Sequence, residues 1–164
     1  MRSACFSCGG SFDDTPDGPV HAYMHSSPGC WVSYGQLLEH EYSEPALFAS
    51  CHRLTVDAYA LQHPGSPGDL RAVQPVWLHA TSLWLIFRDE ADHEFATNAL
   101  KALTGRTPTR LPVAPPRFSM THADIVERPL LEHSRCVAEW ARAALREWSE
   151  LHGEIARLAK FIRG

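Results

Sequence analysis

Apolar residues recur every three or four positions along most of the chain after residue 30, which is the spacing of one face of an α-helix. This pattern predicts four helices, over about 31–42, 45–62, 67–90 and 91–103. Pro45 marks the start of the second helix, because proline suits the first turn of a helix. The stretch from Val76 to Phe87 is apolar on nearly every side and therefore predicts a central, buried helix.

The C-terminal part of the chain carries the same spacing over its greatest length. From about Leu131 to Ile162, apolar residues keep a helical spacing while charges fill the other face, so one continuous amphipathic helix is predicted. No segment alternates clearly enough to predict a β-strand. The fold class is therefore predicted to be all-α, a helical bundle of about five helices.

Two segments lack the helical pattern. Residues 1–30 end in a loop rich in Asp, Pro, Gly and Ser, and residues 105–120 are rich in proline and predict an extended crossover. After the crossover, Thr121 is predicted to be a helix N-cap, with Asp124 as the acid of a capping box. We expect a single domain, 1–164, divided into the N-terminal loop segment 1–30, a helical core 31–104, the crossover 105–120 and C-terminal helices 121–164.

Three cysteines near the N-terminus are spaced like metal ligands. Cys5 and Cys8 form a CxxC turn followed by two glycines, which presents two thiolates to one ion. Cys30 lies in a turn that enters the first predicted helix, where the helix dipole favours a thiolate. Structural zinc sites are tetrahedral and use four Cys or His ligands, so these thiols supply three quarters of a Zn²⁺ site. Residues 1–30 are thus predicted to be a metal-binding, zinc-knuckle-like loop at the N-terminus of the bundle.

The geometry of a helical hairpin suggests the fourth ligand. If the first two helices are antiparallel, with a turn near residue 44, the residue of the second helix level with Cys30 lies one turn short of His63. His52 lies roughly 9 Å nearer the bend at the rise of an α-helix. His63 is therefore the first choice, His52 the second, and His21 or His25 on the loop itself the third.

A second polar group is predicted inside the bundle. The second and third helices should also form an antiparallel hairpin, which brings His79 level with His52. Such a pair could bind a second metal, act as acid and base, or satisfy each other's hydrogen bonds. His52, His79 and the nearby Tyr59 are the candidates for catalytic groups. Asp57 lies off their stripe and is expected at the surface or in a hairpin contact.

Composition narrows the classes of function. The chain has 164 residues, is 45% hydrophobic and 21% charged, and carries a formal net charge of −4, as is typical of soluble globular proteins. It has no basic tail or stripe, so binding to nucleic acid or to a membrane surface is not expected. No signal or membrane-spanning segment is visible, and a cytoplasmic protein is predicted. In a reducing compartment, Cys51 and Cys136 are expected to be ordinary core residues rather than disulfide partners.

The segment from Cys51 to Gly65, together with the CxxCG start and the Cys30-Trp31 pair, resembles a family of small, mostly actinomycete bacterial proteins of unknown function. The family signature is H-x-L-T-V-x-x-Y-x-x-Q-H-P. Phe6 stands where a small residue or proline is more usual. The resemblance carries no assigned activity, but it implies that seven residues form one motif: Cys5, Cys8, Cys30, His52, Tyr59, Gln62 and His63.

Three functions stay open at this point. The first is a protein in which structural zinc ties the N-terminal loop to the bundle, and the bundle binds a small molecule or a protein partner. The second is a zinc enzyme with three protein ligands, in which His52, His79 or Tyr59 supplies acid and base chemistry. The third is a thiol redox switch that releases the metal on oxidation. The amphipathic last helix packs either on its own bundle or on a second subunit in a homodimer.

Overall fold

The structure is a computed structural model that describes residues 1–126 and 128–164. These residues are mostly helical, which confirms the predicted all-α fold. The α-helices are α1 (Pro28–Ser43), α2 (Pro45–Gln62), α3 (Leu70–Phe87), α4 (His93–Ala99), α5 (Ala123–Val126), α6 (His133–Glu147) and α7 (His152–Arg163). Short 3₁₀-helices span Leu100–Leu103, Leu130–Glu132 and Ser149–Leu151, and the strands β1 (Arg2–Ala4) and β2 (Ser11–Asp13) form a hairpin.

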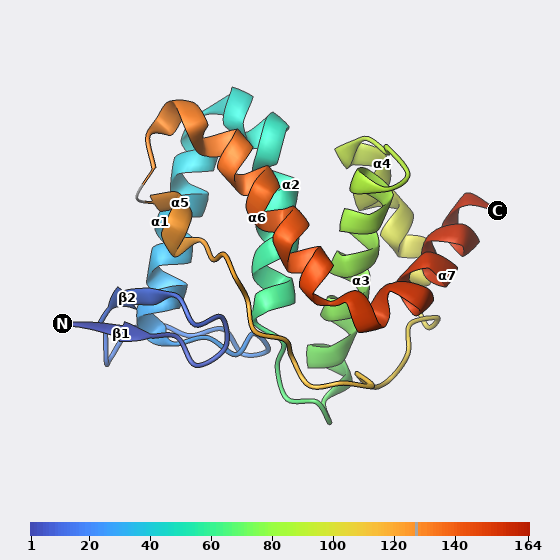
Figure 1. Ribbon diagram of the computed structural model, residues 1–164, viewed down its shortest axis with the longest axis horizontal. Coiled ribbons are helices and arrows are strands. Elements are labelled where there is room, and N and C mark those ends of the chain that lie inside the picture. Colours follow the sequence, from blue (N-terminus) through green and yellow to red (C-terminus); the bar gives the residue numbers. More distant parts are fainter. Residues whose placement is uncertain (127) are drawn as a thin grey trace.

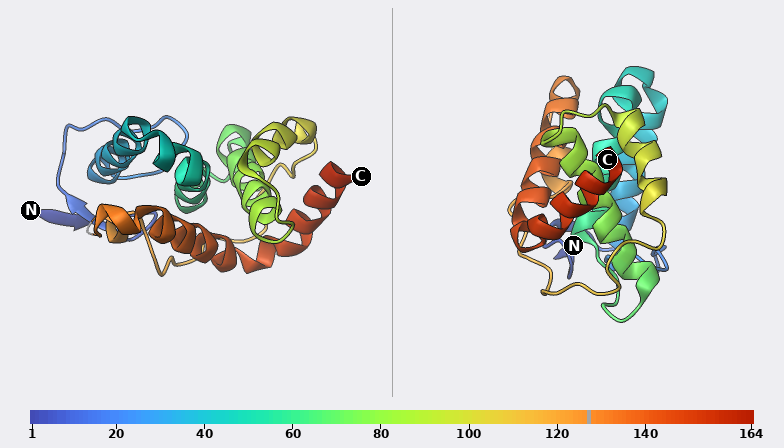
Figure 2. Two further views of the ribbon diagram at one scale, coloured as in Figure 1. Left: turned by 90° about the horizontal axis from the view of Figure 1, so that it is seen from above. Right: turned by 90° about the vertical axis from the view of Figure 1, so that its right-hand side faces the viewer.

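The helices form two layers. Consecutive helices α1, α2 and α3 run in opposite directions and lie side by side (Figure 1). Helix α6 crosses one face of this layer, where it packs against α2, and α7 continues across α3 (Figure 2). The β-hairpin lies at the end of the molecule that α1 occupies, and α7 lies at the opposite end (Figure 1). The crossover connects the two ends before the chain enters α5.

Helix α2 lies in the middle of the core and is anchored by tryptophans of the C-terminal helices. Trp140 of α6 and Trp148 directly after it are buried, and their indole N–H groups donate to the side-chain Oε1 of Gln62 at 3.0 Å and to the carbonyl of Leu61 at 2.9 Å. Gln62 in turn donates to the carbonyl of Met120 at 2.7 Å. The C-terminal end of α2 is thereby fixed against both α6 and the crossover.

The predicted continuous helix from Leu131 to Ile162 is wrong, because the chain bends between α6 and α7. Trp148 ends α6 with φ −85° and ψ 31°, and a 3₁₀ turn precedes α7. One straight helix of this length would be roughly 48 Å long and could not pack along both α2 and α3. The bend lets α6 pack on α2 while α7 packs on α3 (Figure 1).

The β-hairpin at the N-terminus was not predicted. Its strands are three residues long and pair Arg2 with Asp13 and Ser3 with Phe12, which is too short for a period-two pattern to stand out. Phe12 is its buried apolar side chain, at 4% exposure. Gly29 in the first turn of α1 lies directly against the carbonyl of Asp13, where any side chain would collide. The hairpin therefore packs closely on the start of α1.

Two further features of the helices bear on the predictions. The backbone N–H of Thr121 donates to the Asp124 carboxylate at 2.8 Å, which is the bond that the acid of the predicted capping box makes. Within the part of the chain that the structure describes, no helix combines the length and the apolar character needed to cross a bilayer.

Candidate metal centre

The CxxC turn connects the two strands of the hairpin. The N–H of Cys5 donates to the carbonyl of Gly10 at 2.8 Å, and the N–H of Gly9 donates back to the carbonyl of Cys5 at 2.9 Å. Gly9 has φ +79°, a left-handed conformation that glycine adopts without strain. This tight turn holds Cys5 and Cys8 on the same side of the loop, where both are buried.

Cys30 lies in the first turn of α1, opposite the CxxC turn. The Ser27 hydroxyl caps the helix by accepting from the N–H of Cys30 at 3.3 Å, and Pro28 occupies the first helical positions. The Cys30 side chain is completely buried. Its position at a helix N-terminus favours the thiolate form, because the dipole places partial positive charge there.

His63 follows the last residue of α2 and is fixed in one orientation. Its Nδ1 lies 2.8 Å from the carbonyl of Tyr59, which can only accept, so Nδ1 carries the proton. This tautomer leaves the lone pair on Nε2, as in most metal-binding histidines. Nε2 lies 3.3 Å from the sulfur of Cys30 and 3.8 Å from that of Cys5. The imidazole therefore presents its ligating nitrogen to the thiols.

The side chains of Cys5, Cys8, Cys30 and His63, here called the cysteine cluster, thus converge from three segments of the chain. All are buried, and their ligand atoms lie within 4.8 Å of one another. The sulfurs of Cys8 and Cys30 are 4.0 Å apart. A tetrahedron with zinc–sulfur bonds of about 2.3 Å and a zinc–nitrogen bond of about 2.0–2.1 Å has edges of about 3.6–3.8 Å. The separations fit that size, so the cluster could hold a metal ion.

The electrostatics of the thiols also favour a cation. Interaction with the Cys30 thiol lowers the pKa of Cys5, whereas interaction with Cys5 raises the pKa of Cys30. Three thiolates this close repel one another, so by themselves they cannot all ionise. A divalent ion at their centre would allow all three to lose their protons.

A layer of hydrogen-bond donors surrounds the sulfurs. The N–H of Ser27 points to Cys5 and that of Gly10 to Cys8, each at 3.4 Å. Burial raises the pKa of the Tyr59 hydroxyl, which keeps its proton and lies 3.5 Å from the Cys30 sulfur. Such outer contacts orient ligands and stabilise their negative charge.

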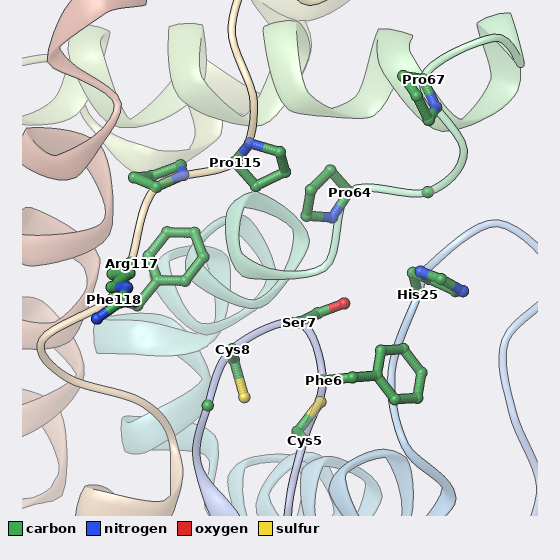
Figure 3. A pocket seen from close by; sticks show the side chains of 13 residues that line it. Cys5, Phe6, Ser7, Cys8, His25, Pro64, Pro67, Pro115, Arg117 and Phe118 are labelled. Atoms are coloured by element: carbon green, nitrogen blue, oxygen red, sulfur yellow. The ribbon is translucent and has the colours of Figure 1, made fainter.

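A hollow of about 900 Å³ adjoins the cysteine cluster (Figure 3). Its walls come from residues 5–9 of the CxxC turn, from the turn that follows α2 and from residues 115–118 of the crossover, with His25 at one side. Cys5 and Cys8 form part of its floor. The hollow therefore lies between segments that the cluster holds and the proline-rich crossover.

The other predicted metal ligands lie outside this cluster. His52 faces α1, where its Nδ1 lies 2.9 Å from a carboxylate oxygen of Glu41. On the loop, Nδ1 of His21 accepts from the backbone N–H groups of Tyr23 and Met24 at 3.1 Å. His25 makes an edge contact with the ring of Phe6 at 4.8 Å. The identity of the metal ligands stays a prediction, and the geometry favours His63 as the fourth.

The candidate catalytic groups have separate partners rather than one another. His79 lies 2.6 Å from Asp57, which also forms an ion pair with Arg53 and accepts from Ser82 at 2.6 Å. Asp57 is completely buried, so the surface position is wrong, whereas its bonds to His79 and Ser82 of α3 are the hairpin contact that was the alternative prediction. Its charge is balanced by Arg53, four residues earlier on the same helix, which the sequence could have suggested.

Sequence reasoning missed three buried groups. His122, before α5, is stacked on Phe12 at 4.5 Å, and burial lowers its pKa to about 3. Glu41 and His133 bond to each other at 3.0 Å across 92 positions of the chain. No local spacing connects such residues, and a charged side chain near a helix end is more often solvated.

The fold and the cluster define a helical protein with a Cys₃His group that could bind a metal. Over residues 3–149 the chain matches the model of a family described as a family of unknown function (DUF5946). The chain belongs to that family. No curated protein and no solved structure matches it.

Proposed function

We propose that the protein binds one zinc ion through Cys5, Cys8, Cys30 and His63, and that this ion is structural. The supporting observation is the convergence of four buried ligand atoms from the hairpin, the start of α1 and the end of α2. Soft thiolates combined with one imidazole are the ligand set that tetrahedral zinc prefers. The ion would fasten the N-terminal segment to two helices of the bundle.

The geometry favours a structural ion over a catalytic one. Catalytic zinc usually has three protein ligands and an open position for water, whereas four protein ligands complete a tetrahedron. Tyr59 contacts the Cys30 sulfur through its hydroxyl and therefore supports a ligand. The thiols are at most 3% exposed, which disfavours a redox switch, since oxidation needs an accessible thiolate.

The hollow beside the cluster is the proposed binding surface for a small molecule or a partner. It is of the size of ligand-binding pockets. Part of its wall follows directly on the proposed ligands: Phe6, Ser7 and Gly9 stand beside Cys5 and Cys8, and Pro64 comes after His63. An ion that fixes these ligands would therefore also fix this part of the hollow.

Elemental analysis of the reduced, full-length protein tests the metal. We expect Cys8→Ser to contain one zinc ion per chain fewer than the wild type, because it removes one of four ligands. Cys136→Ser is the matched control, since Cys136 is also buried but lies outside the cluster on α6. Equal zinc contents in the wild type and Cys8→Ser, or a wild type without zinc, would contradict the proposal.

A further inference from the structure

A second group of potential ligands lies at the other end of α1, where α1, α2 and α6 meet. Glu41 in the last turn of α1 is completely buried. One carboxylate oxygen accepts from the Thr55 hydroxyl at 2.5 Å and lies 3.0 Å from Nε2 of His133. The other oxygen lies 2.9 Å from Nδ1 of His52. These residues and Cys51 are called the Glu41 cluster below.

The charge of Glu41 has no permanent counter-ion within residues 1–126 and 128–164. Burial by itself would raise the pKa of Glu41, but hydrogen bonds from His133, Thr55 and His52 outweigh it and lower the pKa below its ordinary value. Among the residues that the structure describes, no arginine or lysine forms a hydrogen bond or an ion pair with this carboxylate. A buried carboxylate that stays ionised is paired with a cation or binds a metal.

Asp57 in the same bundle shows the contrast. It is buried to the same extent, also accepts from a hydroxyl and also contacts a histidine, but Arg53 supplies a permanent positive charge. Glu41 has imidazoles, a hydroxyl and a thiol in place of that guanidinium. Imidazole and thiol are the groups that bind transition metals once they lose a proton.

The ligand atoms have the separations of one coordination shell. Glu41, Cys51 and His133 each offer an atom within 4.8 Å of the other two. The Cys51 sulfur lies 3.7 Å from the carboxylate oxygen that His133 contacts. The corresponding edges of a zinc tetrahedron are about 3.4–3.6 Å. In addition, Nε2 of the neighbouring His40 is buried without a hydrogen-bond partner among the described residues.

We propose that Glu41, Cys51 and His133 form a second binding site for a divalent transition-metal ion, with Zn²⁺ as the best match. Binding would release the proton of the Cys51 thiol and the proton between His133 and the carboxylate of Glu41. Thr55 would keep its hydrogen bond and orient Glu41. The site is independent of the cysteine cluster, since the two share no residue.

The second site would lie behind a cleft of ligand size. His52 lines a cleft of about 490 Å³ between α2 and α4, and its side chain is 14% exposed. The groups of the proposed site are buried. His52, which bonds to the other oxygen of Glu41, is therefore the residue through which a molecule in the cleft would contact the site.

The test is a metal titration of the full-length protein. After removal of bound metal and reduction, the wild type is titrated with Co²⁺, and bound ions per chain are counted by elemental analysis. We expect two ions in the wild type and one in Cys51→Ser and Glu41→Gln. Cys136→Ser is the matched control and should bind two. A wild type that binds one ion, or a Cys51→Ser protein that binds as many as the wild type, overturns the proposal.

A second measurement does not depend on any variant folding. Nitrogen NMR of the histidine rings in the zinc-loaded wild type reports which nitrogens carry protons. We expect Nε2 of His133 to be unprotonated, because it would face the ion. A proton on this nitrogen would mean that His133 donates to Glu41 in place of binding a metal, and the second site would be rejected. Loss of zinc from Cys8→Ser tests the cysteine cluster separately.

Discussion

The cysteine cluster and the Glu41 cluster are both buried, yet they connect different kinds of structure. The cysteine cluster joins a loop and a short hairpin to the ends of α1 and α2. The Glu41 cluster joins three helices that already pack through apolar side chains. In the first, the ligands are the main link between segments. In the second, they add polar contacts to an existing core.

The difference concerns what each cluster stabilises. Residues 1–27 contain two short strands and few buried apolar side chains, so a bound ion would supply much of the free energy that keeps them folded. The helices around Glu41 bury tryptophan and leucine side chains, and their packing does not depend on one polar group. Loss of the first cluster should therefore unfold a segment, and loss of the second should only weaken the bundle.

The largest effect is expected for Cys30→Ser. The variant loses the ligand that connects the hairpin to α1, so we expect it to lose the zinc ion of this cluster. The free energy of unfolding should fall by about 3 kcal/mol or more. For a chain of this size that corresponds to a fall in Tm of about 6–12 °C. Calorimetry measures the change in Tm, and hydrogen exchange should speed up in residues 1–27 but not in α7.

The same experiment can contradict the proposed difference between the two clusters. If Cys30→Ser loses zinc while the amides of residues 1–27 keep their protection, then the β-hairpin and Phe12 hold the segment without the ion. In that case the two clusters would both be accessory, and the contrast between them would disappear.

The next effect in size is expected for Glu41→Gln. The amide keeps the shape of the side chain but removes its charge, so we expect a loss of about 1–3 kcal/mol at neutral pH. The pKa of Glu41 is lowered in the folded state, so its contribution is complete above about pH 4.5 and is lost as the pH falls through the folded-state value. Denaturant unfolding at several pH values should show the curves of the two proteins converging in acid. A constant difference down to pH 2 would contradict this.

A smaller effect is expected for Tyr59→Phe. This change removes the hydroxyl near the Cys30 sulfur but keeps the ring, which stacks on Tyr34 at 3.6 Å and on His63 at 3.9 Å. Loss of one outer contact should weaken zinc binding about 10-fold, which is about 1.4 kcal/mol. Competition with a chelator of known affinity measures it. Tyr34→Phe is the control, and an equal loss there would mean that the hydroxyls act through packing alone.

Much of the fold could be predicted because helices leave local signals. Helix α2 spans Pro45–Gln62, the range that its proline and apolar spacing predict. The proximity of His63 to Cys30 could be predicted, because it depends only on the rise of a helix and on the position of the turn between α1 and α2. The bend after Trp148 could not be predicted in this way, because it depends on which neighbours α6 and α7 cover.

The two clusters also differ in whether local sequence predicts them. Cys5 and Cys8 are two positions of one turn, and a CxxC spacing is visible in any sequence. Glu41, Cys51 and His133 come from three helices, and their proximity follows from how those helices cross. The predicted pairing of His52 with His79 rests only on their equal distance from the bend between two helices. In the structure, His52 bonds to the carboxylate of Glu41 instead. The position of a polar residue along a helix does not determine which of several neighbouring side chains becomes its hydrogen-bond partner.

The smallest effect is expected for Phe6→Ser. Phe6 lies between Cys5 and Cys8 but is 63% exposed, and its contact is with His25 at the side of the hollow. The zinc content should be unchanged and the stability should change by no more than about 0.5 kcal/mol. Phe12→Ala is the contrasting control, because that ring is buried in the hairpin and its loss should be costly. Should Phe6→Ser release zinc, the wall of the hollow would be part of what holds the ion, and the cysteine cluster would depend on its surface as well as on its ligands.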